Sequence, residues 1–214
     1  MSYAIPSLPR VSAAERGLTI ADFLVPVRVG ERVSPRSRDL GLVLAGVALM
    51  ILGSRISMPL PGNPVPFTLQ TLAVLIVGGS LGLRRGAISV GLFVVLGIVG
   101  LPVFAESRGG LQVILGTSGG YLVGFIAAGA LVGRLAELGW DRHIGGSVGM
   151  NLLGTAMIYL VGVPWLAVAG GLSAADAVRF GLVPFLAADV VKLLVAAGAF
   201  PAAWWVVGRR PSDR

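Results

Sequence analysis

The chain has 214 residues, of which 55% are hydrophobic and only 13% are charged. Soluble domains carry about 25% charged residues, so this composition predicts a membrane protein. The absence of cysteine and the single histidine, His143, exclude disulfides and argue against cysteine or histidine metal sites. The net charge of +7 is compatible with nucleic-acid binding only if the basic residues do not follow a membrane topology.

Six segments in the sequence are long and apolar enough to cross a bilayer, which requires about 20 residues of helix. In chain order they cover about 40–58, 67–83, 86–104, 120–138, 144–170 and 180–207. Pro164 is expected to bend the fifth. The sequence therefore predicts an all-α integral membrane protein, a bundle of six transmembrane helices within residues 39–208.

Residues 1–38 and 209–214 flank this membrane domain. The N-terminal extension contains no long apolar run, and we expect it to be a flexible tail on the cytoplasmic side. The alternative for LTIADFLVPV, residues 18–27, is a segment that lies along the inner membrane surface. Residues 209–214 are expected to form a short cytoplasmic tail.

Basic residues alternate across the predicted spans, and this asymmetry sets the orientation. With the N-terminus inside, thirteen arginines lie on the inner side and three, Arg55, Arg108 and Arg179, on the outer side. Lys192 is the remaining basic residue and lies within the last span. Both termini are therefore expected in the cytoplasm, and the positive charge reflects topology instead of nucleic-acid binding.

Small residues on the first span form a second pattern. Gly41 and Ala45 have small-xxx-small spacing, and Ala48 follows one turn later. In lipid, small residues allow two helix backbones to approach closely. The pattern fits either internal packing or docking of a partner helix.

The most informative polar feature is ADVVK in the last span. Asp189 and Lys192 are three residues apart, so their side chains share one helix face. A charge near the middle of the bilayer costs about 2.5 to 3.5 kcal/mol and is rarely placed there without a function. The pair either neutralises itself within the bundle or lines a polar cavity, with Lys192 as a cationic anchor for an anionic ligand and Asp189 as an acceptor.

Other polar and glycine residues gather at the outer ends of the spans and are candidates for the same cavity. The substrate-binding candidates besides the pair are Gln70, Thr71, Arg108, Thr117, Gly119, Gly120 and Tyr121. Asn151, near the inner end of the fifth span, is expected to hydrogen-bond to a neighbouring helix. The sequence contains no HExxH motif and no paired carboxylates in the spans, so neither an enzyme activity nor a cofactor is expected.

Three stretches together resemble a known family. PVPFTLQTLAVLIVGGSLGLRRGAISVGLFVVLGIVGLPVFA, GGLQVILGTSGGYLVGF and ADVVK, in this order and spacing, are similar to the BioY family, the substrate-binding (S) components of energy-coupling-factor (ECF) biotin transporters. The resemblance covers roughly residues 40–207. Thr117 and Ser118 stand where the family usually has proline and threonine, and Ala188 replaces a glycine.

The resemblance implies that the protein captures biotin from outside with high affinity, in the inner membrane of a bacterium. Its partners would be a transmembrane coupling protein, which docks on the Gly41, Ala45 and Ala48 face, and two ATPase subunits. Lys192 would hold the valerate carboxylate, and Asp189 would contact the ureido ring or orient the lysine. The outer loops, 58–66 and 105–119, would close over the ligand.

The residues alone leave two other functions open. One is a self-sufficient, proton-coupled secondary transporter of a small carboxylate, in which Asp189 relays the proton and Lys192 is its counter-ion. The other is a structural membrane subunit that binds no small molecule.

Overall fold

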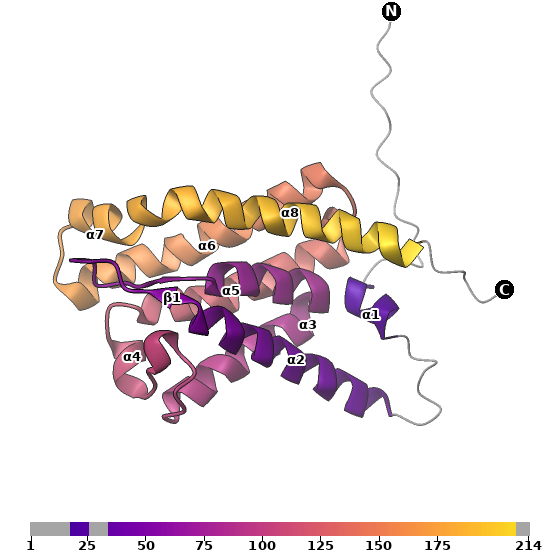
Figure 1. Cartoon of the computed structure of the whole chain (residues 1–214), viewed down its shortest axis with the longest axis horizontal. Coiled ribbons are helices and arrows are strands. Elements are labelled where there is room, and N and C mark those ends of the chain that lie inside the picture. The colour runs from indigo at the N-terminus through magenta and orange to yellow at the C-terminus, as the bar shows by residue number, and fades with distance from the viewer. Residues whose placement is uncertain (1–17, 26–33, 209–214) are drawn as a thin grey trace, which may run out of the picture.

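A computed structural model gives the fold, and it describes residues 18–25 and 34–208. Helices dominate these residues, and a hairpin of two short strands is the only sheet within them (Figure 1). The elements are α1 (Ile20–Leu24), α2 (Pro35–Arg55), β1 (Ser57–Met58), β2 (Phe67–Thr68), α3 (Gln70–Ile98), η3 (Ala105–Ser107), α4 (Leu111–Leu115), α5 (Gly119–Glu137), η4 (Trp140–Arg142), α6 (Ile144–Gly170), α7 (Ala174–Gly181), η5 (Val183–Phe185) and α8 (Leu186–Gly208).

Helix α2 begins five residues before the expected start of the first span. The Ser34 hydroxyl accepts a hydrogen bond from the backbone N–H of Ser37, and Pro35 occupies the first helical turn. Both are favoured at a helix N-terminus. The helix therefore begins in the polar sequence that precedes the apolar run, which is why hydropathy alone placed its start too late.

Helix α3 contains the second and third predicted spans, joined by a break at Gly82. Gly82 has φ of 81° and ψ of −178°, a backbone conformation accessible to glycine. A Cβ atom placed on Gly86 would lie 3.1 Å from the Cα of Gly78. Eight residues of straight helix would separate them by about 12 Å. The chain therefore folds back at Gly82, and the second half of α3 ends at Ile98, earlier than the predicted end at residue 104.

Five helical segments among the described residues are long and apolar enough to cross a membrane: α2, α3, α5, α6 and the run from Ala174 to Val207. The structure divides this last run into α7, η5 and α8, where the sequence predicted a single span from residue 180. Helix α6 continues through Pro164. The fold-back within α3 supports a topology of six crossings, which stays a prediction.

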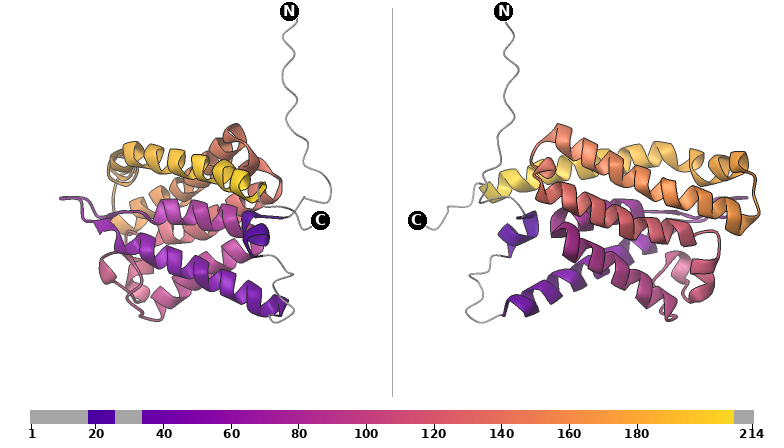
Figure 2. Two further views of the ribbon diagram at one scale, coloured as in Figure 1. Left: turned by 45° about the vertical axis from the view of Figure 1, so that its right-hand side comes forward. Right: turned by 180° about the vertical axis from the view of Figure 1, so that it is seen from behind.

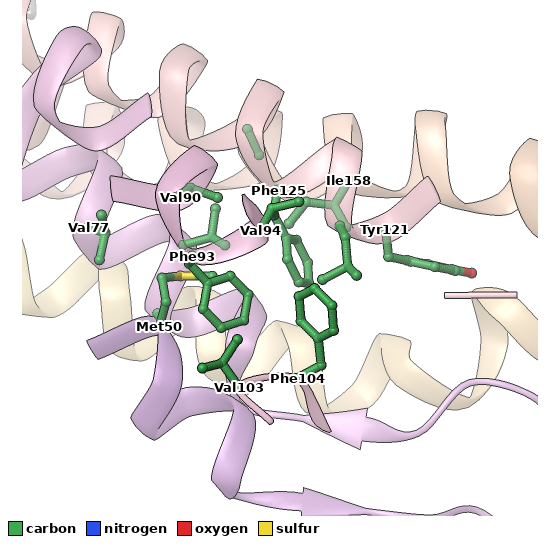
Figure 3. Close-up of a cluster of buried hydrophobic side chains, with 14 of the residues drawn as sticks. Met50, Val77, Val90, Phe93, Val94, Val103, Phe104, Tyr121, Phe125 and Ile158 are labelled. Carbon is green, nitrogen blue, oxygen red and sulfur yellow. The ribbon is translucent and has the colours of Figure 1, made fainter. Parts of the chain in front are cut away.

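The long helices lie side by side, with different elements at the two ends of the bundle (Figures 1 and 2). Helices α4 and α7 and the β1–β2 hairpin lie at one end, and α1 and the C-terminal end of α8 lie at the other. We call these the hairpin end and the α1 end. A buried apolar cluster that includes Met50, Phe93 and Phe104 fills the interior (Figure 3). Val77 and Tyr121 lie at opposite edges of this cluster.

Helix α1 changes the expectation for the N-terminal extension. Residues 18–25, expected within a flexible tail, form a capped helix whose Ile20 and Ala21 are buried. Asp22 accepts hydrogen bonds from Arg38 and Arg85, at 2.9 and 2.8 Å. Burial by itself raises the pKa of Asp22, but the bonds from Arg38, the Thr19 backbone and Arg85 hold it below its usual value. Residues 1–17, 26–33 and 209–214 lie outside the described residues.

Candidate ligand site

A cavity opens at the hairpin end of the bundle and contains about 630 Å³ of empty space, counting the space at its mouth. Most of its wall is apolar and aromatic, and a few polar groups converge in it. Its lining residues are Val65, Pro66, Thr68, Gln70, Thr71, Phe104, Ala105, Arg108, Val113, Ser118, Tyr121, Leu122, Phe125, Ile158, Tyr159, Phe185, Asp189 and Lys192.

The Asp189–Lys192 ion pair lies in this wall. Both residues belong to α8, and only 5% of Asp189 and 6% of Lys192 is exposed. Lys192 Nζ lies 2.8 Å from Asp189 Oδ1. Because the two charges are in direct contact, the pair presents an acceptor and a donor side by side without a net charge.

Two further helices complete the hydrogen bonding of the pair. Lys192 Nζ donates to the Thr71 hydroxyl on α3 at 2.9 Å, and this hydroxyl donates to Asp189 Oδ1 at 3.3 Å. Tyr159 on α6 donates to Asp189 Oδ2. The ammonium group of Lys192 also lies 4.2 Å from the centre of the Phe67 ring, within cation–π range. The pair is thereby fixed by α3, α6 and α8 together.

Gln70 brings an unused donor to the same cavity. Only 4% of this residue is exposed, and its side-chain Nε2 has no hydrogen-bond partner. A buried amide without a partner costs about 1 to 3 kcal/mol. An acceptor on a bound ligand would remove this cost.

Arg108 supplies the cavity's second positive charge, in a different environment. Its side chain is 45% exposed and forms an ion pair of 3.2 Å with Glu106. The loop that carries it is tied to the end of α2, because Ser54 Oγ donates to the Val103 carbonyl at 2.6 Å and Arg55 donates to the Pro102 carbonyl at 2.8 Å. The cavity thus has a buried neutral pair and a separate, water-accessible arginine.

The structure brings most of the predicted site residues together. The cavity lining includes Gln70, Thr71, Arg108, Tyr121, Asp189 and Lys192. Tyr121 also fixes the wall, since its hydroxyl donates to the Gly181 carbonyl at 2.8 Å and so joins α5 to the end of α7.

Three predicted residues do not line this cavity. Thr117 lies in an adjoining hollow and donates to the Pro64 carbonyl at 3.0 Å. Gly119 and Gly120 serve close packing, because a Cβ on them would lie 1.7 Å from the Ile114 carbonyl oxygen and 2.2 Å from the Trp165 Cβ. Their lack of a side chain lets α5 begin against these neighbours.

Sequence reasoning missed Tyr159, which bonds directly to Asp189. A signal was available, because Tyr159 is a polar aromatic residue near the middle of an apolar segment. The sequence instead drew attention to Asn151, two turns earlier on α6, as a residue that bonds to a neighbouring helix. Its Nδ2 donates to the Ser147 carbonyl in its own helix at 2.8 Å, so the expected bond to a neighbouring helix is replaced by a local one.

The small residues of α2 have a clear position. Gly41, Ala45 and Ala48 are all exposed, and nothing lies within 4 Å of a Cβ placed on Gly41. This face of α2 therefore does not pack against the other described helices. No group of three metal-ligating side chains occurs among residues 18–25 and 34–208.

Apolar helices around a partly polar cavity, with an ion pair buried in its wall, define a membrane protein with a site for a small ligand. The chain belongs to the BioY family, whose model matches residues 27–209. This is a family of transporters and not of enzymes.

Curated relatives include the biotin transporter BioY of Thermotoga maritima, 40% identical over 161 residues, which cover 73% of this chain and 90% of the relative. The probable biotin transporter BioY of Pyrococcus horikoshii is 36% identical, with 75% and 93% covered. The crystal structure of an S-component for biotin from an ECF-type ABC transporter superposes with a TM-score of 0.73 at 27% identity, covering 79% of this chain and 92% of that one.

Proposed function

We propose that the protein is the substrate-specific component of an ECF-type transporter and that it captures biotin in the cavity at the hairpin end. The observation that carries this proposal is the buried Asp189–Lys192 pair, fixed by Thr71 and Tyr159 in a mainly apolar cavity. Relatives named biotin transporters and the likeness to an S-component for biotin support the substrate. They do not favour a proton-coupled carrier.

The geometry favours a particular orientation of biotin. The ureido ring of biotin has two N–H donors and a carbonyl acceptor, which complement the Asp189 carboxylate and the Lys192 ammonium. A valerate carboxylate at the same place would put two negative groups against one ammonium in a buried site, which is unfavourable. The ureido ring therefore contacts the pair, and its carbonyl accepts from Lys192.

The carboxylate of biotin then lies at the mouth, near Arg108. There it keeps part of its hydration and gains a guanidinium partner, so the cost of burying a charge is avoided. This orientation reverses the role that the family resemblance implied for Lys192 and keeps Asp189 at the ureido ring. The apolar walls, including Phe104, Phe125 and Phe185, would cover the rest of the molecule.

The exposed face of α2 is the proposed docking surface for a transmembrane coupling protein that works with two ATPase subunits. Gly41, Ala45 and Ala48 lie on that face. Without a hydrophobic driving force between helices in lipid, such a face supports the close backbone contact that membrane helices use to associate.

The proposed orientation in a bacterial inner membrane places the hairpin end outside. Arg38 and Arg85 meet at the α1 end, whereas Arg55 and Arg108 lie by the cavity. The positive-inside rule places the arginine-rich α1 end in the cytoplasm together with both termini. The cavity then opens to the outer side, from which a scavenged vitamin arrives.

Calorimetric titration of the purified protein in detergent tests the function. Biotin should bind tightly with a stoichiometry of one, and a dicarboxylate without a ureido ring, such as pimelate, should not compete. The titrated protein must first be shown to be folded by circular dichroism. A folded sample that takes up no biotin would overturn the proposal.

A further inference from the structure

A second hollow adjoins the biotin cavity at the hairpin end. It contains about 500 Å³ of empty space, counting its open side, and shares Arg108, Val113 and Ser118 with the first cavity. Its other lining residues include Gln112 and Thr117. Both spaces therefore border Arg108, and we call the second one the vestibule.

The vestibule is more polar than the cavity. Val113 is the only large aliphatic side chain in its lining, and the rest are glycines and polar residues. Its walls are braced by hydrogen bonds: Gln112 Nε2 donates to the Gly109 carbonyl at 3.0 Å, and Trp165 donates to the Gly116 carbonyl at 2.9 Å. A braced polar wall suits a hydrated, polar group and does not suit the ring system of biotin.

We propose that the vestibule is a subsite for groups joined to the carboxyl of biotin through an amide, so that the protein also binds biotin derivatives such as Nε-biotinyl-lysine. This inference rests on the proposed function and on the orientation that places the carboxyl at Arg108. An amide at this point keeps a carbonyl acceptor for Arg108, and its substituent continues into the vestibule. The zwitterionic head of the lysine then lies among the polar side chains of the vestibule, which include Gln112 and Thr117.

Replacement of the biotin carboxylate by an amide should cost little binding free energy, because Arg108 is partly exposed to water. Ion pairs of exposed side chains contribute little, so loss of the carboxylate charge weakens binding by less than about tenfold. Biotinyl-lysine should therefore bind within about tenfold of biotin. A closed site without a vestibule would instead reject the larger ligand by steric overlap.

A blocking variant tests the subsite directly. Gln112 lines the vestibule but not the biotin cavity. The variant Gln112→Trp should therefore fill the vestibule and leave the biotin cavity unchanged. Leu115→Trp is the matched control, since Leu115 is in the same short helix, is 63% exposed and lines neither space. Each protein is titrated with biotin and with biotinyl-lysine.

The expected result is selective. Gln112→Trp should keep the Kd for biotin within about twofold and raise the Kd for biotinyl-lysine at least tenfold, and Leu115→Trp should change neither. Gln112→Phe serves as the blocking variant if the tryptophan protein does not retain biotin binding.

Each other outcome has a separate meaning. Wild-type protein that binds biotin but not biotinyl-lysine overturns the vestibule subsite and leaves the proposed function intact. Equal weakening of both ligands by the blocking variants also overturns the subsite. Wild-type protein that binds neither ligand overturns the proposed function itself.

Discussion

Replacement of Lys192 by methionine removes the ammonium group and keeps most of the buried stem. In the wild-type protein this group contacts Asp189 at 2.8 Å and Thr71 at 2.9 Å. The variant leaves the Asp189 carboxylate buried with hydroxyl donors from Thr71 and Tyr159 but without a cation. Removing one partner of a buried ion pair typically costs about 3 to 5 kcal/mol of stability.

The effect on biotin binding has a different origin. The ureido carbonyl would lose a hydrogen bond from a charged donor, which is worth about 1.5 to 3 kcal/mol and corresponds to a loss of about 10- to 150-fold in affinity. Calorimetry with biotin measures the affinity, and thermal unfolding of the ligand-free protein measures the stability. Val191→Met, at an exposed neighbouring position of α8, is the control for the substitution itself.

A double variant separates stability from recognition. Asp189→Asn combined with Lys192→Met removes both charges, so it should recover much of the lost melting temperature while biotin affinity stays low. A folded Lys192→Met protein with wild-type affinity for biotin would refute the reasoning, because it would show that the buried pair does not contact the ligand.

Three further predictions concern the mouth, the loop and the α1 end. Arg108→Gln should abolish the small preference for biotin over biotin amide in calorimetry, whereas Lys192→Met should leave the ratio of the two Kd values unchanged. If Lys192→Met abolished the preference and Arg108→Gln kept it, the carboxylate of biotin would lie at Lys192 and the proposed orientation would be wrong. Arg55→Gln should speed biotin dissociation about tenfold in stopped-flow experiments, because loop 102–107 loses bonds to α2, and an unchanged off-rate would contradict this tether. Burial raises the pKa of Asp141 to about 6, above its value in the unfolded chain. The protonated Asp141 carboxyl therefore contributes fully to folding stability below about pH 4, and this contribution is lost as the pH rises through 6. Melting temperatures of Asp141→Asn should therefore fall less between pH 4 and 7.5 than those of the wild type, and parallel curves would contradict the pKa shift.

The sequence predicted the helical class and the central ion pair because both depend on local information. Apolar runs of sufficient length identify membrane helices, and three-residue spacing places Asp189 and Lys192 on one face. The turn between the second and third segments was also located correctly near Arg84, since the helical break falls at Gly82. Each of these features can be read within a few turns of helix.

The features that the sequence did not predict depend on contacts between distant segments. Tyr159 joins the site only because α6 packs beside α8, and no local pattern marks which face of α6 is directed there. Gly119 and Gly120 suggested a ligand-binding loop, yet the same lack of side chains is required for packing against Ile114 and Trp165. Helix α1 has only five residues, and its order depends on Arg38 and Arg85, which lie 16 and 63 residues away from Asp22.

Helix α2 connects the proposed docking face with the wall of the cavity. Its exposed small residues Gly41, Ala45 and Ala48 lie between its first and last turns, and its last turn holds loop 102–107 through Ser54 and Arg55. Phe104 and Ala105 of that loop line the cavity. Because the Ser54 bond to the Val103 carbonyl is buried, α2 cannot shift at this end without moving the loop or breaking the bond. A partner that displaces α2 while this bond holds would therefore move loop 102–107 and with it the cavity wall, and Ser54→Ala should weaken the response of biotin release to the partner more than it weakens biotin binding alone.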